Sequence, residues 1–257
     1  MQVALSYASL LETPLAHPET GLGGNLFYAG ELEAAGRALV VAANIAGAAT
    51  LVATADPAAQ KQAVRDGVAD FAVTTHDEAL RILKNQLRKR ETVAVCVALP
   101  LSEIDREINE RGLAPDLLRR DLRIPPLHQA LLIQQNAEAL IVPEDAPTEP
   151  DPSRTPALVT WRVGSALPKD LAKLDEIALT CLDPEEWKSH RWLRLSPRYL
   201  GRMAQGLRLL DSNCTFAARF IDRARQSVDL GEITFAIEIV SYFRGQRDVY
   251  RFSPTKP

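Results

Sequence analysis

The sequence predicts an α/β protein in which a doubly wound parallel sheet with flanking helices is followed by a smaller α+β domain. Short apolar runs alternate with helical patterns in the first half, an order that is typical of a parallel doubly wound sheet. A segment dense in proline and acidic residues follows at 143–156, which we interpret as a linker or long surface loop. After it the regular alternation ends, which indicates α+β architecture.

The composition excludes several classes of protein. The 257 residues are enough for one large domain or two modest ones, and 46% hydrophobic with 25% charged residues excludes a disordered, collagenous or coiled-coil chain. Thirty basic and 33 acidic residues give a net charge of −3, so no global attraction draws the chain to nucleic acid or anionic lipid. The sequence shows no secretory leader pattern and no apolar window of about 20 residues, so we expect a cytoplasmic protein that binds neither nucleic acid nor membrane.

Four strands are expected in the first half, at 25–29, 49–53, 71–74 and 92–97. The last of them is apolar almost throughout, as suits a strand that is covered on both faces. Between the first two strands, residues 31–46 have a helical pattern rich in alanine, which allows a helix to approach a sheet closely.

Two further helices are expected from their end signals. Residues 58–66 form a helix that Gly67 closes in the left-handed conformation. Ser102 is expected to cap a helix that runs to Arg111 and ends at Gly112.

A capping box at Thr75-His76-Asp77-Glu78 predicts another helix start. The helix that follows places Leu80, Leu83 and Leu87 on one stripe. Since His76 lies inside the box, we expect this side chain at the surface.

The second half is expected to mix strands and helices. Strands are predicted at 157–163 and 176–182. Ser196 followed by Pro197 predicts a helix start, with an inward face made of Tyr199, Leu200, Met203, Leu207 and Leu210. A second helix carries Phe216, Phe220 and Ile221, and a hairpin runs from 232–243 through Gly245 into 248–252.

The turn from the first strand into the first helix is where a dinucleotide-binding fold places its glycine-rich loop. Gly30 and Gly36 occupy suitable positions there, but Glu31 and Glu33 would repel a diphosphate, so a turn without phosphate is the main interpretation. Asp56, after the second strand, is suited to accept a ribose hydroxyl or to cap the next helix, and capping is the favoured role.

Other candidate sites have plainer interpretations. The glycine cluster at 21–24 is interpreted as a turn before a strand. The basic run at 84–90 has no interleaved aromatic residue and is interpreted as a solvated helix end. The four histidines and three cysteines lack metal-ligand spacing, so no metal site is expected, and Cys96, Cys181 and Cys214 are expected to be small buried side chains.

A series of short motifs follows in order along the first half: Gly23-Gly24-Asn25-Leu26, Ala29-Gly30, Ala42 to Ala48, Asp56-Pro57, Gly67 to Asp70, Asp77 to Leu80, and Arg111 to Asp116. This series resembles the NAD-binding Rossmann-like domain of urocanase (urocanate hydratase). The resemblance implies a Rossmann-like fold for residues 21–142 and a family whose activity uses NAD.

The departures from that family fall on its NAD site. Where the family has a glycine-rich turn that cradles the NAD pyrophosphate, this chain has Glu31 to Gly36, and the family's acidic residue at the end of the second strand falls on Thr54. Leu99-Pro100-Leu101 and Asp121 to Pro125 replace two further family segments, and nothing after the linker resembles the family's catalytic core. If NAD binds, the resemblance implies contacts at Gly30, Gly36, Thr54 and Asp56.

We therefore divide the chain into an N-terminal arm (1–20), a urocanase-type Rossmann-like domain (21–142), the linker (143–156) and an α+β domain (157–257). The leading hypothesis is a non-catalytic binding or assembly protein without a cofactor, with a different small-molecule ligand in the cleft at the strand ends. The alternative is a divergent NAD-dependent lyase or hydratase. A third hypothesis is a subunit, such as that of a homodimer, whose apolar segment Ile233 to Ile239 pairs with a partner chain.

Overall fold

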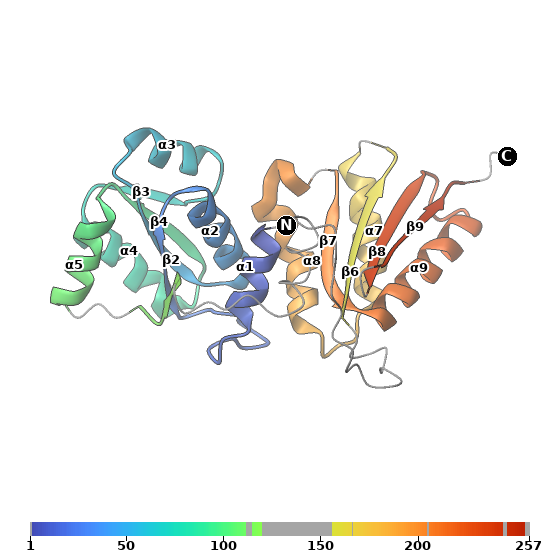
Figure 1. Cartoon of the computed structure of the whole chain (residues 1–257), viewed down its shortest axis with the longest axis horizontal. Helices are drawn as coiled ribbons and strands as arrows, with labels where there is room; N and C mark the ends of the chain where they lie inside the picture. The colour runs from blue at the N-terminus through green and yellow to red at the C-terminus, as the bar shows by residue number, and fades with distance from the viewer. Residues whose placement is uncertain are drawn as a thin grey trace. The chain divides into compact units, whose positions relative to one another are not determined.

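The computed structural model describes residues 2–111, 115–119, 156–165, 167–204, 206–243 and 246–254. The chain forms two compact units, Met1–Pro125 and Pro126–Pro257 (Figure 1). The segment interpreted as a linker, 143–156, lies outside the described residues except for its last residue.

The first unit is built on a five-stranded sheet in which every neighbouring pair of strands is parallel. Its strands are β1 (Leu26–Glu31), β2 (Ala49–Ala53), β3 (Phe71–Val73), β4 (Val93–Val97) and β5 (Leu117–Leu118), in the spatial order β3-β4-β2-β1-β5. The four strands expected from the sequence are thus confirmed, each within a residue or two at its ends. The short strand β5 was not expected.

One helix precedes the first strand, and four others connect the strands in turn. They are α1 (Gln2–Leu11), α2 (Ala34–Ala46), α3 (Pro57–Arg65), α4 (His76–Lys89) and α5 (Leu101–Arg111). The step from β1 to β2 and the step from β3 to β4 run in opposite directions across the sheet, so right-handed crossovers place α2 and α4 on opposite faces. The N-terminal helix α1 belongs to this unit and packs against α2.

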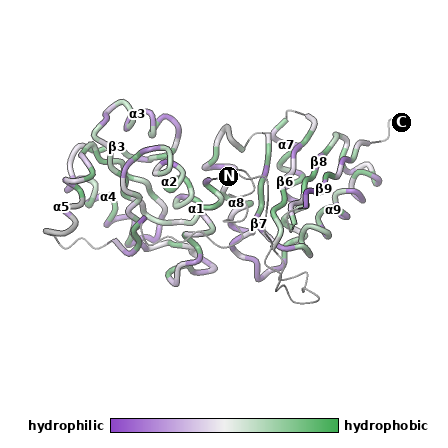
Figure 2. The backbone as a smooth tube through the Cα atoms, viewed as in Figure 1, coloured by the Kyte–Doolittle hydropathy of each residue, from purple (hydrophilic) through white to green (hydrophobic). Residues whose placement is uncertain are grey.

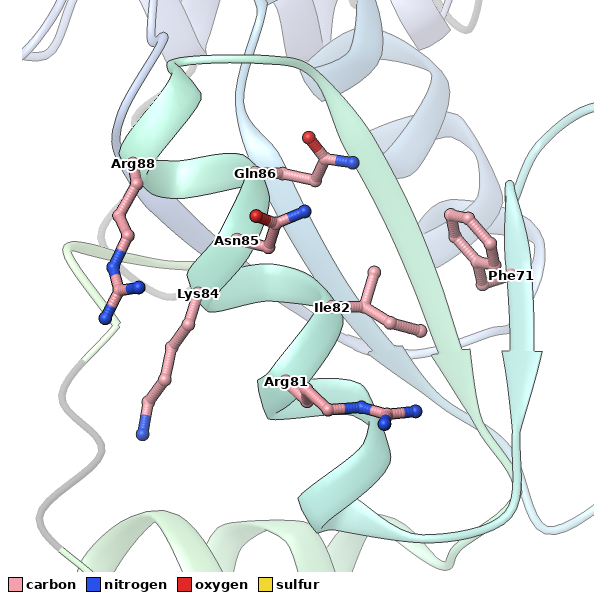
Figure 3. Close-up of a pocket in the computed structure, with 7 residues that line it drawn as sticks. All are labelled: Phe71, Arg81, Ile82, Lys84, Asn85, Gln86 and Arg88. Carbon is pink, nitrogen blue, oxygen red and sulfur yellow. The ribbon is translucent and has the colours of Figure 1, made fainter.

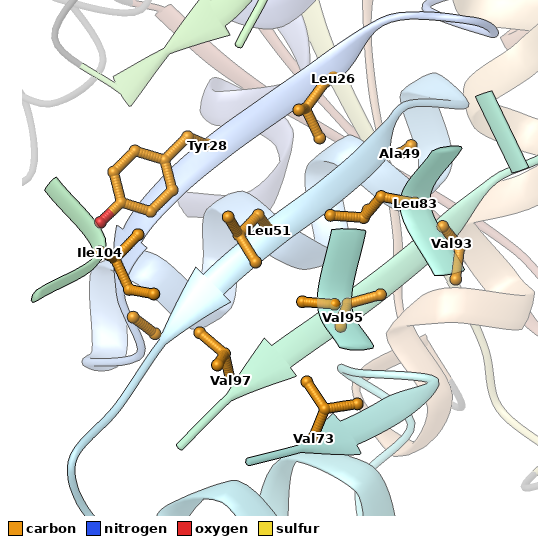
Figure 4. Packing of buried hydrophobic residues seen from close by; sticks show 12 residues of the cluster. Leu26, Tyr28, Ala49, Leu51, Val73, Leu83, Val93, Val95, Val97 and Ile104 are labelled. Carbon is orange, nitrogen blue, oxygen red and sulfur yellow. The ribbon is translucent and has the colours of Figure 1, made fainter. Parts of the chain in front are cut away.

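The core on the α4 face is a cluster of aliphatic side chains from all the longer strands (Figure 4). Leu51 and Val95 lie at its centre, Ala79 and Leu83 cover it from α4, and Ile104 covers it from α5. In Figure 2 the central strands carry hydrophobic colours, whereas α3 mixes hydrophilic and hydrophobic residues. The predicted Rossmann-like layering is therefore confirmed.

Two local expectations in this unit were wrong. His76 is only 5% exposed, because it is the first residue of α4 and shares the inward stripe of Ala79, Leu80 and Leu83. Ser102 is not a cap. It lies inside α5, and the carbonyl of Pro100 accepts the first helical bonds from the amides of Glu103 and Ile104.

The second unit is a four-stranded antiparallel sheet with helices. It contains β6 (Pro156–Val163), α7 (Pro168–Cys181), α8 (Trp187–Leu200), the 3-10 helix η2 (Gly201–Ala204), β7 (Arg208–Asn213), α9 (Cys214–Asp229), β8 (Ile237–Phe243) and β9 (Gln246–Phe252). The strand order is β7-β6-β8-β9. The ring of Trp161 meets Phe220 of α9 edge to face at 4.9 Å, which joins the sheet to that helix. The expectation of an α+β domain is confirmed.

Two elements of the second half were predicted wrongly. Residues 176–182 belong mostly to α7, where Leu171, Leu174, Ala178 and Cys181 repeat at helical spacing and are buried.

Pro197 does not open a helix, because it lies near the end of α8, whose inward face of Trp192, Leu193 and Ser196 precedes it. Leu207 and Leu210, expected on that helix, lie beyond its end at Leu200: Leu207 is exposed and Leu210 belongs to β7.

The hairpin of β8 and β9 is confirmed, with Phe243 opposite Gln246 and the expected turn residue Gly245 outside the described part. β8 begins at Ile237, later than expected, and pairs with β6 on one side and β9 on the other. Both edges of Ile237–Ile239 are thereby occupied, so a partner strand cannot add there. The outer strands of this sheet are β7 and β9.

Candidate functional site

The candidate site is the carboxyl edge of the parallel sheet, where β1, β2 and β5 end. Ligands of open α/β folds bind outside the carboxyl ends of the strands. They bind between two neighbouring strands whose following connections run in opposite directions across the sheet. The connection from β1 leads through α2 to β2, whereas β5 lies on the other side of β1. The predicted residues Gly30, Thr54 and Asp56 lie at these strand ends, so the structure brings them to one edge, and Arg119, which was not predicted, lies there too.

Gly30 allows the end of β1 to depart from regular pairing with β2. Its φ is +76°, a conformation that favours glycine, and the β1–β2 register shifts between Tyr28 and Glu31. A Cβ on Gly30 would lie 3.9 Å from Cδ of Arg119, so the arginine side chain passes directly beside this turn.

Gly36 lets α2 begin in close contact with the end of β1. A Cβ at this position would stand 1.9 Å from the carbonyl oxygen of Glu31, a distance that no real contact allows. The glycine is therefore required by helix-to-strand packing, one of the roles that glycines have in dinucleotide-binding turns.

The charged side chains at this edge form an ion pair. Oε1 of Glu33, the residue that precedes α2, lies 2.8 Å from Nη1 of Arg119, just after β5. The two side chains are 54% and 40% exposed, so the pair sits at the surface, between the neighbouring strands β1 and β5. Glu31 is exposed beside it.

This arrangement does not fit an NAD pyrophosphate. A diphosphate at a helix start needs accessible amides and a positive potential. Here Glu31 is the last residue of β1 and Glu33 directly precedes α2, so two carboxylates belong to the turn between them, and Arg119, the nearby cation, is already paired with Glu33. The scaffold glycines remain, but the electrostatics of the turn oppose an anion.

The side chains that follow β2 are used to build the next helix. Oγ1 of Thr54 accepts from the amide of Asp56 at 3.2 Å, and Oδ1 of Asp56 accepts from the amide of Ala58 at 2.8 Å. Asp56 is thus the N-cap of α3, which confirms the favoured interpretation. Because Thr54 is buried and its hydroxyl already takes part in this turn, it offers little to a ribose.

The glycine cluster at 21–24 lies at the opposite end of β1 and forms turns. A Cβ on Gly23 would lie 3.1 Å from the carbonyl oxygen of Arg90, and Gly24 has φ +92°. These glycines allow the loop to pack against the end of α4. The interpretation as a turn is confirmed.

The sequence analysis missed Arg119 and the role of Asp116. Oδ2 of Asp116 accepts from the amide of Leu26 at 2.7 Å, which holds the start of β1 beside β5. The only sequence signal for either residue was the motif Arg111 to Asp116, which ends directly before β5.

A buried polar cluster in the second unit joins three side chains by hydrogen bonds. Nε of Arg208 donates to Oδ2 of Asp175 at 2.8 Å, and Nε1 of Trp161 donates to Oδ1 at 2.9 Å. Burial raises the pKa of the Asp175 carboxyl, although the charge of Arg208 acts in the opposite direction. The cluster joins α7 to β6 and β7, which is a structural role.

A second cluster in this unit fixes the loop before α8. Oε1 of Glu186 accepts from Oγ of Ser212 at 2.9 Å and from Nδ2 of Asn213 at 2.8 Å. Oδ1 of Asn213 in turn caps α9 by accepting from the amide of Phe216 at 2.8 Å. These bonds tie the loop before α8 to the junction of β7 and α9.

None of the three cysteines forms a disulfide, and two of them match the expectation of burial. Burial raises the pKa of the Cys96 thiol to about 11, and burial also raises the pKa of Cys181. Cys214 is partly exposed at the start of α9, so the expectation of burial was wrong for this residue. Within the described ranges, no group of three or more histidine, cysteine or acidic side chains could hold a metal ion.

Comparison with known families agrees with this architecture. The family described as the urocanase Rossmann-like domain matches residues 5–122, which lie in the first unit and include most of α1. The resemblance to the urocanase family is therefore confirmed for this unit, and it extends further toward the N-terminus than the motifs indicated. In the part of the chain that the structure describes, no helix is long and apolar enough to cross a membrane.

Proposed function

We propose that the first unit is a urocanase-type Rossmann domain that serves binding or assembly and not NAD-dependent catalysis. The Glu33–Arg119 ion pair is the observation that carries this proposal, because it occupies the edge between β1 and β5 where a pyrophosphate would need positive charge. The capping role of Asp56 supports it, since that carboxylate accepts a backbone amide of α3.

Thermal unfolding of the full chain with and without NAD tests this proposal. A ligand present at one hundred times its dissociation constant stabilises the folded state by about 2.7 kcal/mol. For a unit of this size, that free energy corresponds to a rise in melting temperature of roughly 10 °C. We expect no rise at millimolar NAD, and a saturable rise would refute the proposal.

A variant without carboxylates in the turn between β1 and α2 tests whether negative charge is what opposes pyrophosphate binding. Glu31→Gln/Glu33→Gln removes both carboxylates from the turn between β1 and α2 and releases Arg119 from its partner. We expect this variant to gain affinity for inorganic pyrophosphate relative to the wild type. The matched control is Asp77→Asn/Glu78→Gln, which removes two negative charges from the first turn of α4 and should not change pyrophosphate affinity.

The alternative is a divergent NAD-dependent lyase or hydratase, and the retained glycines favour it. Gly30 and Gly36 still shape the strand-to-helix turn as a dinucleotide fold requires. The chain would then consume urocanate in the presence of NAD. Loss of the urocanate absorbance band on incubation with the full chain would support the enzyme, and an unchanged band would support the binding role.

A further inference from the structure

A groove of about 560 Å³ lies on the flank of the first unit, between α4 and the outermost strand β3. We call it the α4 groove; it is lined by Phe71 of β3 and by residues 81, 82, 84–86 and 88 of α4 (Figure 3). Phe71 is the first residue of β3, so this groove lies away from the carboxyl edge that holds Gly30 and Asp56. It is therefore a separate surface from the candidate site above.

The floor of the α4 groove is apolar. Phe71 is 44% exposed, although it is an aromatic residue on a strand, and Ile82 of α4 is half-buried. In Figure 3 both side chains project into the hollow between helix and strand, with Asn85 and Gln86 beside them. An aromatic ring left open next to an aliphatic side chain offers a contact for an apolar group of another molecule.

Three cations of α4 also line the groove, and in Figure 3 Arg81 extends toward the Phe71 side of the helix whereas Lys84 and Arg88 extend toward its other side. Arg81, Lys84 and Arg88 are exposed and spaced as i, i+3 and i+7, so they lie near one another on the surface of α4. Among the residues that the structure describes, none of the three makes an ion pair. Some exposed arginines elsewhere have carboxylate partners, such as Arg37 with Asp66 and Arg219 with Asp183. Among the described residues, the exposed Lys61 and Arg65 of α3 likewise make no ion pair, but no exposed aromatic ring lies in a groove beside them.

We propose that the α4 groove docks an acidic segment of a partner protein. Carboxylates at helical spacing would face Arg81, Lys84 and Arg88, and one apolar side chain would seat between Phe71 and Ile82. The charge of the partner follows from complementarity with three cations that have no counter-charge in the described structure. The apolar seat follows from the exposed aromatic ring.

Two other classes of ligand fit the α4 groove less well. Small-molecule sites enclose roughly 70–90% of their ligand, whereas the cations here stand exposed on an outer helix face. Single-stranded nucleic acid needs successive aromatic platforms and a wider basic track. Phe71 is the one aromatic residue lining the groove, and the chain as a whole carries a net charge of −3.

Fluorescence anisotropy with the full chain tests this proposal. The probe is a fluorescein-labelled helical peptide of 18 residues, made of glutamate with leucine at every fourth position. We expect saturable binding that weakens with salt, because the contact is partly electrostatic. No saturable binding at millimolar protein would overturn the proposal.

Charge-reversal variants provide a matched pair. Lys84→Glu/Arg88→Glu should weaken peptide binding about tenfold. Lys61→Glu/Arg65→Glu makes the same charge change at the same spacing on exposed residues of α3, and it should alter binding less than about twofold. If both variants lost peptide affinity equally, the peptide would be attracted by positive charge in general and not by the α4 groove. That result would refute the proposal.

A third variant tests the apolar seat and separates the remaining outcomes. Phe71→Ser should weaken peptide binding about fivefold without unfolding the chain, because Phe71 lies on an edge strand and is already 44% exposed. Tighter binding of a single-stranded oligonucleotide through the same residues would overturn the proposal in favour of nucleic acid. A dimer that Lys84→Glu/Arg88→Glu dissociates would overturn it in favour of self-association. None of these results depends on whether NAD binds.

Discussion

The substitution Gly36→Ala tests the close approach of α2 to β1. The added Cβ would stand 1.9 Å from the carbonyl oxygen of Glu31, about 1.5 Å short of the 3.4 Å at which ordinary contact begins. The obstacle is a backbone carbonyl, and the position of a Cβ is fixed by its own backbone. Neither atom can therefore move away by a change of rotamer. The helix must shift, or β1 must lose its bulge at Gly30.

The expected change in the free energy of unfolding is the balance of two opposing effects. Overpacking at a rigid contact costs roughly 1–3 kcal/mol, and here the upper end applies because the obstacle is backbone. Replacing glycine by alanine inside a helix contributes about 1 kcal/mol in the opposite direction. We therefore expect a net loss of about 2 kcal/mol in the free energy of unfolding of the first unit.

Chemical denaturation followed by circular dichroism measures this loss. Gly206→Ala is the control, because a Cβ there would meet no atom within 4 Å. The control should change the free energy of unfolding by less than about 0.5 kcal/mol. If Gly36→Ala is as stable as the wild type, or more stable, the proposed contact between α2 and β1 is wrong.

Three further predictions follow from the two units. Asp56→Ala should cost about 1 kcal/mol of stability through loss of the α3 cap, and Asp56→Asn should retain most of it, as measured by urea denaturation. Arg208→Met should cost about 3–5 kcal/mol in the second unit, because it leaves the Asp175 carboxylate buried without its cation; a loss below 1 kcal/mol would contradict this. Because the pKa of Cys96 is raised to about 11 in the folded state from an ordinary 9.0, its contribution to stability is full below pH 9 and falls as pH rises toward 11. Cys96→Ala should lessen that fall in pH-dependent melting curves, and an unchanged pH profile would exclude this thiol as its source.

The first unit was predictable because its signals are local. The apolar run of β4, the capping box at Thr75 and the cap at Asp56 each determine an element from a few neighbouring residues. The second unit was harder, since the short apolar run at 176–182 suits a strand as well as part of a helix. The prediction at Pro197 was wrong for a similar reason. Ser196-Pro197 is a pair typical of a helix start, but it occurs inside α8.

The candidate site and the α4 groove could be predicted only in part. Gly30 and Gly36 were identified because motif spacing marks them, but Arg119 meets Glu33 only after β5 pairs with β1. Likewise Phe71 joins the basic helix only when β3 lies beside α4, so the sequence shows a basic run without an aromatic partner. Contacts between distant segments need the sheet order, which the sequence does not contain locally.

Isothermal titration of the full chain with NAD tests the central claim most directly. The account predicts no saturable heat for the wild type up to millimolar NAD, because Glu31 and Glu33 make the turn between β1 and α2 negative and Arg119 is already paired with Glu33. A saturable isotherm with a dissociation constant in the range of about 1–100 μM, or roughly −8 to −5 kcal/mol, would contradict it.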